Sequence, residues 1–169
     1  AQELGIPLTL HTGVSYVCPQ PNSHCHPQQL DDVALAFPDL KMIAYHAGWP
    51  YTEELIGLCG KHKNLYMSLS GIFGWYQRSP YRGYHAIGTA LQWVPADKIV
   101  LGFDLPFDDL PRVTDYIRDL SMPEELQEKW GYAQVTDEDK AKILGLNLAK
   151  LTGIEPTKRA KFAAAKPTK

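Results

Sequence analysis

A short apolar run with one polar side chain just after it recurs four times in this chain. The runs at residues 6–10, 41–45, 65–69 and 99–102 lead into His11, His46, Ser70 and Asp104, respectively. Apolar, β-branched runs of this length are typical of strands that are buried on both faces, as in a parallel sheet. We therefore predict four strands, each of which carries a polar group close to its C-terminal end.

Helical segments separate these runs. We predict helices at residues 28–36, 52–59, 85–93, 108–120 and 137–151. Polar residues that follow successive strands at intervals of roughly 25 to 35 positions indicate parallel strands joined by helical crossovers. Four such units make half of an eight-stranded (β/α) barrel, whose full length is typically about 250 residues. The predicted fold class is therefore α/β, of the (β/α)8 TIM-barrel type, and a half-sheet of this kind is expected to have two open edges.

The composition favours a soluble globular domain. The 169 residues are enough for one core, and the net charge of −2 favours neither nucleic acid nor a membrane surface as partner. No apolar stretch approaches the length of about 18 residues that a transmembrane helix needs. Three cysteines, Cys18, Cys25 and Cys59, are best interpreted as free thiols in a reducing cytosol, although Cys18 and Cys25 could pair. We predict a cytoplasmic protein.

The two ends of the chain differ from its centre. The opening segment AQELGIPLTLH resembles the end of a helix that runs into a strand, so we expect the preceding units to have been removed, truncated or split off. The closing segment is basic and rich in small residues, which is typical of a solvated tail. We predict one half-barrel domain at residues 1–154 and a flexible tail at residues 155–169.

Three of the polar residues indicate a metal site. The strand ends of a barrel converge on one mouth, so His11, His46 and Asp104 are expected to meet there. Two imidazoles and a carboxylate suit Zn²⁺, with Mn²⁺ or Fe²⁺ as alternatives. A single polar residue after a strand is often only a turn residue, and Ser70 with Gly71 is interpreted in that way.

Other residues near the strand ends have less specific interpretations. Trp49, Tyr51, Trp75 and Phe107 could line a substrate pocket or simply cover the barrel mouth, and both alternatives stay open. His24 and His26 flank Cys25, but their spacing matches no common zinc module, so an exposed loop is expected there.

The sequence resembles the C-terminal half of proteins in a known family, the amidohydrolase-related ("amidohydrolase 2") group. The group includes metal-dependent hydrolases and non-oxidative decarboxylases of the aminocarboxymuconate semialdehyde and resorcylate types. The matching segments are LTLHTG (8–13), LDDVALAFPDLKMIAYHAGWPYTEEL (30–55), KHKNLYMSLSG (61–71), KIVLGFDLPF (98–107) and KAKILGLNLAKLTGI (140–154). The resemblance implies that the four strands are strands five to eight of the barrel.

The resemblance also implies roles for individual residues. His11 would be a metal ligand, His46 a ligand or the catalytic acid/base, and Asp104 a ligand or the base that activates water. Two departures stand out. The family's His-x-His pair on strand one has no counterpart in this chain, and Phe103 stands where the family usually has Ser. This chain alone is therefore expected to be an incomplete enzyme.

Three functions remain open at the level of the sequence. The first is a metal-dependent hydrolase of a small carboxylated substrate, for example a cyclic or aromatic one, in which Asp104 accepts a proton from water and His46 stabilises or protonates the developing charge. The second is a decarboxylase that uses the same residues. The third is a non-catalytic half-barrel. In each case we expect a complementary N-terminal half, or a second copy of the chain, to pair across the open sheet edges.

Overall fold

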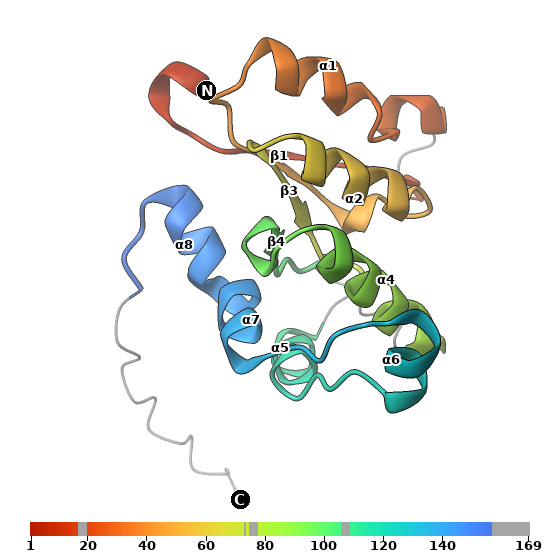
Figure 1. The fold of residues 1–169 in the computed structure, drawn as a ribbon. Helices are drawn as coiled ribbons and strands as arrows, with labels where there is room; N and C mark the ends of the chain where they lie inside the picture. The colour runs from red at the N-terminus through yellow and green to blue at the C-terminus, as the bar shows by residue number, and fades with distance from the viewer. Residues whose placement is uncertain (17–19, 73, 75–77, 106–108, 157–169) are drawn as a thin grey trace, which may run out of the picture.

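The structure is a computed structural model that describes residues 1–16, 20–72, 74, 78–105 and 109–156 (Figure 1). Within these residues, the strands form one parallel sheet in the order β1–β2–β3–β4. The strands are β1 (Leu8–Leu10), β2 (Met42–Ala44), β3 (Leu65–Ser68) and β4 (Ile99–Val100). The predicted order and direction of the strands are confirmed.

The helices alternate with the strands as predicted. The longer ones are α1 (Gln29–Ala36), α2 (Thr52–Lys61), α4 (Pro80–Trp93), α5 (Leu110–Arg118), α6 (Glu124–Trp130), α7 (Asp137–Ala141) and α8 (Asn147–Thr152). Short turns of 3-10 helix are η1 (Gln2–Leu4), η2 (Asn22–Cys25), η3 (His46–Gly48) and η4 (Ala96–Lys98). The single helix predicted at residues 137–151 is interrupted, because the π-helical turn η5 (Lys142–Leu146) lies between α7 and α8.

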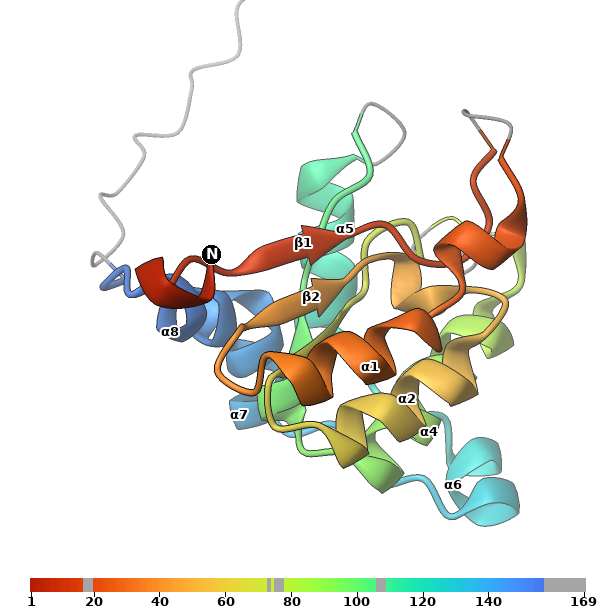
Figure 2. The same cartoon turned by 90° about the horizontal axis from the view of Figure 1, so that it is seen from above.

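The two faces of the sheet are covered differently. One face packs against α1, α2 and α4 in the main core, where Met42, Leu65 and Met67 are fully buried. The other face carries Ile43 and Val100, which pack against Leu151 of α8. Figure 2 shows β1 and β2 pointing in the same direction, with α8 near their starting ends. The strand ends that carry the polar residues therefore lie away from α8.

The outer edge of β4 is not open, and this corrects the expectation of two open edges. Val100 O accepts a hydrogen bond from Leu69 N. The backbone N–H and C=O of Val100 therefore point toward β3, and those of Ile99 and Leu101 point toward the outer edge. There Leu101 N donates to Ile143 O of η5 at 2.9 Å. The Nδ2 of the buried Asn147 donates to Ile99 O at 2.7 Å.

Several predictions about composition and the chain ends can be compared with the structure. Cys25 and Cys59 are free and buried, so the alternative pairing of Cys25 with Cys18 is not formed, and Cys18 itself lies outside the described residues. Among the described helices, none combines the length and the apolar character needed to cross a bilayer. Residues 157–169, most of the predicted tail, also lie outside the described part of the chain.

Cys59 is expected to resist alkylation by iodoacetamide while the chain is folded. Its side chain is fully buried, and burial raises its pKa to about 12, despite the opposing effect of Lys98. Because the thiolate is the reactive form, this shift lowers the reactive fraction by about a thousandfold. Mass spectrometry of the alkylated protein, with and without urea, measures the difference. Modification of Cys59 in the native chain at the rate of the unfolded chain would contradict the prediction.

Candidate metal and catalytic site

The C-terminal ends of β1 and β2 bring two imidazoles together. His11 follows β1 and His46 follows β2, and because the strands are parallel neighbours their ends lie at the same edge of the sheet. The centroids of the two rings are 4.9 Å apart, with the rings inclined at 64°. The sequence prediction that these two side chains converge therefore agrees with the geometry.

Ser70 holds the His46 side chain in one orientation. The Nδ1 atom of His46 lies 3.2 Å from Ser70 O, and His46 N donates to Ser70 Oγ at 3.2 Å. Ser70 Oγ also lies 3.3 Å from His46 Nδ1, so Nδ1 either donates to Ser70 O or accepts from the Ser70 hydroxyl, depending on the tautomer. In the tautomer with the proton on Nδ1, Nε2 keeps a lone pair, which suits it for binding a metal or accepting a proton.

The backbone of the segment after β2 adopts an uncommon conformation. His46 has a φ of 60° and Ala47 a φ of 47°, both in the left-handed region. Residues other than glycine pay about 1–3 kcal/mol for such a conformation, and it is found most often at functional sites. The turn η3 thus places the His46 side chain at a cost in stability.

Asp104 approaches the same place from the end of β4. A Cβ atom built on Gly71 would lie 3.1 Å from His46 Nδ1 and 3.4 Å from Asp104 Oδ2, so both side chains border this glycine. Partial burial lowers the pKa of His11, and the neighbouring His46 lowers it further, whereas Asp104 raises it. Asp104 therefore lies within electrostatic reach of both imidazoles.

The donor types fit a divalent cation, but the described ligand set is incomplete. Imidazole nitrogen and carboxylate oxygen are the ligands that Zn²⁺, Mn²⁺ and Fe²⁺ commonly take in enzymes. However, among the described residues no group of three or more His, Cys, Asp or Glu side chains lies close enough to hold a metal by itself. The arrangement therefore consists of an imidazole pair with a carboxylate near it, and a metal there would need further ligands.

Sequence reasoning missed the role of Ser70 and the need for small residues around it. Ser70 was interpreted as a turn residue, yet it makes the contacts that orient His46. A Cβ on Gly102 would lie 2.4 Å from Ser68 Oγ and 2.9 Å from Ser70 Cβ, so glycine is required where β4 leaves the sheet. In the sequence, the one sign of this role was that Ser70 follows β3 in the way that His11 follows β1 and His46 follows β2.

The predicted aromatic pocket residues fall into two groups. Trp49 and Tyr51 lie before α2 and line a cavity of about 420 Å³ between α2 and α4, here called the α2–α4 cavity. Its lining includes Trp49, Tyr51, Glu53, Arg82, His85 and Thr89. His11, His46 and Asp104 are not part of this lining. Trp75 and Phe107, the other two predicted residues, lie outside the described residues.

Other histidines make contacts that do not involve the imidazole pair. His26 pairs with Glu54 at 3.2 Å and packs on Tyr51, and His24 belongs to the short turn η2. The buried His62 lies 2.5 Å from Asp31 through its Nε2 atom, which links α2 to α1.

Comparison with known proteins identifies similar chains. A family model described as Amidohydrolase matches residues 1–154. No curated protein matches the chain. Among solved structures, a TIM-barrel protein from Bordetella bronchiseptica is 24% identical, with a TM-score of 0.68 over 90% of this chain and 47% of that chain.

Two further structures are similar over a comparable region. A dihydroxybenzoic acid decarboxylase from Polaromonas, solved with bound manganese and an inhibitor, is 16% identical with a TM-score of 0.60, covering 90% of this chain and 51% of that one. An amidohydrolase from Burkholderia multivorans, solved with bound zinc, is 12% identical with a TM-score of 0.55, covering 77% of this chain and 50% of that one. The chain thus spans about half the length of the structures it matches, and its fold is half of a TIM barrel.

Proposed function

Because this chain belongs to the amidohydrolase family, we propose that it supplies the C-terminal half of a metal-dependent active site that hydrolyses a small carboxylated substrate. The observation that carries the proposal is the meeting of His11 with His46, 4.9 Å apart, beside the carboxylate of Asp104. The manganese and zinc in similar folds support a divalent ion as the cofactor. Two imidazole donors favour Zn²⁺ for this chain, with Mn²⁺ or Fe²⁺ as alternatives.

A divalent ion at this place would polarise a substrate oxygen and lower the pKa of water. The residues of the chain would then have separate tasks. His11 and His46 offer ring nitrogens, and the contact between His46 Nδ1 and Ser70 O keeps the His46 ring from turning. Asp104 would accept the proton that water loses as it attacks.

The remaining ligands and strands are proposed to come from a complementary half-barrel. Leu8 N and Leu10 O bond to the segment that contains β2, so the backbone groups of Thr9 face the outer edge of β1. Because Leu101 N and Ile99 O of the opposite edge are already bonded, β1 is the edge at which we expect a new strand to pair. A second copy of the chain is the alternative partner, and sedimentation of the isolated chain distinguishes the two.

Decarboxylation of an aromatic acid is the second candidate. It is favoured by the similarity to the Polaromonas decarboxylase, which extends over 90% of this chain. In that reaction the ion would hold the carboxylate, and a protonated side chain at the same place would deliver a proton to carbon. The substrate for a direct test is therefore a dihydroxybenzoate.

The proposal is tested with the chain joined to a complementary N-terminal half that carries a His-x-His segment. The metal-free protein is titrated with Zn²⁺, Mn²⁺ or Fe²⁺ and assayed on carboxylated cyclic amides, on lactones and on dihydroxybenzoate. Hydrolysis that appears with the metal and disappears with a chelator is the expected result. Release of CO2 from dihydroxybenzoate would instead establish the second candidate. Metal binding without turnover of any substrate would leave the non-catalytic half-barrel as the function.

A further inference from the structure

The α2–α4 cavity is separate from the imidazole pair, and its function has not been accounted for. It lies on the helical side of the sheet, between the start of α2 and the side of α4, and its volume of about 420 Å³ is that of a small-molecule pocket. Residues of α2 form one wall and residues of α4 form the other.

The α4 wall carries a fixed imidazole. The phenol oxygen of Tyr132, whose side chain is buried, lies 2.5 Å from His85 Nδ1 and 2.9 Å from Thr89 Oγ1. The edge of the His85 ring also packs on Trp130, with ring centroids 4.9 Å apart. These contacts fix the ring through one nitrogen only. The other, Nε2, makes no hydrogen bond to any residue that the structure describes.

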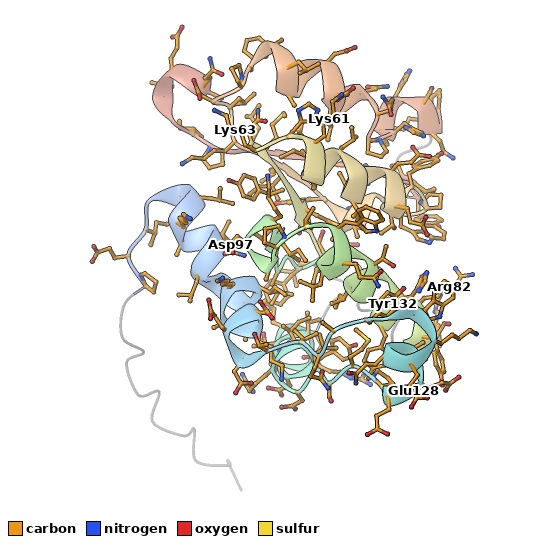
Figure 3. The ribbon with its side chains drawn as sticks, viewed as in Figure 1. Lys61, Lys63, Arg82, Asp97, Glu128 and Tyr132 are labelled. Atoms are coloured by element: carbon orange, nitrogen blue, oxygen red, sulfur yellow. The ribbon has the colours of Figure 1, made fainter. Side chains whose placement is uncertain are left out.

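The same wall carries an exposed guanidinium. Arg82 precedes His85 by three residues on α4, so the two side chains lie on one face of the helix, and both line the cavity. Arg82 makes no ion pair or side-chain hydrogen bond within the described part of the chain. Figure 3 shows Arg82 and Tyr132 on the same side of the molecule. The α4 wall thus presents a cation and an imidazole nitrogen that have no described partner.

The α2 wall carries the opposite charge. Glu54 is occupied by its ion pair with His26 at 3.2 Å, whereas Glu53 makes no ion pair with a described residue. Burial raises the pKa of Tyr132, and the Glu53 carboxylate raises it further, which places Glu53 within electrostatic reach of the α4 wall. Glu53 and Arg82 therefore line the same cavity and form no ion pair with each other.

Aromatic side chains complete the lining. Tyr51 packs on His26 with ring centroids 4.0 Å apart, and Trp49 stacks on Tyr16 at 6.2 Å. Both line the cavity and supply apolar surface between the charged walls.

We propose that the α2–α4 cavity binds a small zwitterion of the α-amino acid class. The carboxylate of the ligand lies against Arg82 and His85, its ammonium group lies against Glu53, and its side chain packs on Trp49 and Tyr51. A ligand with both charges satisfies both walls, whereas a simple anion would be repelled by Glu53 and a simple cation by Arg82. The site is independent of the proposed catalytic function.

The test is a calorimetric titration of the 169-residue chain with three probes that share a phenyl ring. Free phenylalanine carries both charges, phenylpropionate only the carboxylate, and phenethylamine only the ammonium group. Phenylalanine is expected to bind at least about tenfold more tightly than either of the others. Equal binding of phenylalanine and phenylpropionate would overturn the proposal in favour of a simple anion site, and absence of phenylalanine binding would overturn it altogether.

Charge-neutralising variants locate the site. Arg82→Gln and Glu53→Gln are each expected to weaken phenylalanine binding by at least about tenfold, because each removes one of the two charge contacts. Arg118→Gln on α5 and Glu128→Gln on α6 remove the same charges from exposed positions outside the cavity lining, and they are expected to bind as the unchanged chain does. Unaltered binding in both Arg82→Gln and Glu53→Gln would place the ligand elsewhere.

Discussion

Asp104→Asn is expected to abolish turnover by the complete enzyme while the fold of this chain stays intact. The Asp104 carboxylate borders Gly71, as His46 does, and the proposed function has it accept a proton and face a cation there. An amide of the same shape is a very poor proton acceptor at neutral pH and a weaker ligand. Since general acid–base catalysis contributes about a hundredfold to ten-thousandfold, the loss of rate is expected to reach at least that range.

The measurement is the turnover and metal content of the enzyme assembled from this chain and its complementary half. Asp39→Asn is the matched control, because Asp39 is an exposed carboxylate that pairs only loosely with Lys63, at 3.5 Å. His24→Ala, in the turn η2, is a second control, and both controls are expected to keep full activity. Full activity in Asp104→Asn, or a loss confined to His24→Ala, would show that the catalytic site lies elsewhere.

Asn147→Ala is expected to lower the free energy of unfolding by about 1–3 kcal/mol, because the buried Ile99 O loses its donor and Ala96 O keeps its bond from Ile99 N but loses that from Asn147. The buried amide of Asn147 donates to the carbonyl oxygens of Ala96 and Ile99, each at 2.7 Å. Alanine fills less space and donates nothing, so both oxygens would remain buried without that bond. The loss would also loosen α8 from the edge of β4.

Urea denaturation, followed by circular dichroism, measures this change. Asn22→Ala is a suitable control because Asn22 is exposed in η2, and its replacement is expected to leave stability within about 0.5 kcal/mol. An Asn147→Ala variant as stable as the unchanged chain would mean that the two carbonyls find other donors. It would also remove the stated reason for the closed edge of β4.

The order of the strands could be predicted because it depends on a local pattern. Each strand is a short apolar run, and the spacing of the runs requires parallel crossovers whatever the tertiary contacts are. The closed edge of β4 depends on contacts of another kind. Asn147 bonds to Ile99 across 48 positions of sequence, and the carbonyl that binds Leu101 comes from a π-helical turn. Neither contact leaves a periodic signal.

The candidate site could be predicted to a similar extent. The ends of parallel strands account for the approach of His11 to His46, which needed no knowledge of side-chain contacts, and the use of Asp104 with them stays a prediction. The orientation of His46 by Ser70 depends on hydrogen bonds between successive strand ends, and a serine before a glycine looks the same in an ordinary turn. Trp49 and Tyr51 could be predicted to lie near a pocket or the barrel mouth, but the α2–α4 cavity that they line depends on the packing of α2 on α4.

The bonds that close β4 also decide how this chain can associate with itself. Sheets extend into fibrils when each copy offers one edge to accept a neighbour and another to recruit the next. Here Leu101 N and Ile99 O are already hydrogen-bonded to Ile143 and Asn147 of the same chain. The outer edge of β4 therefore cannot use these groups to pair with β1 of another copy. The turn η5 and helix α8 thus remove one of the two edges that edge-to-edge polymerisation of this chain would need.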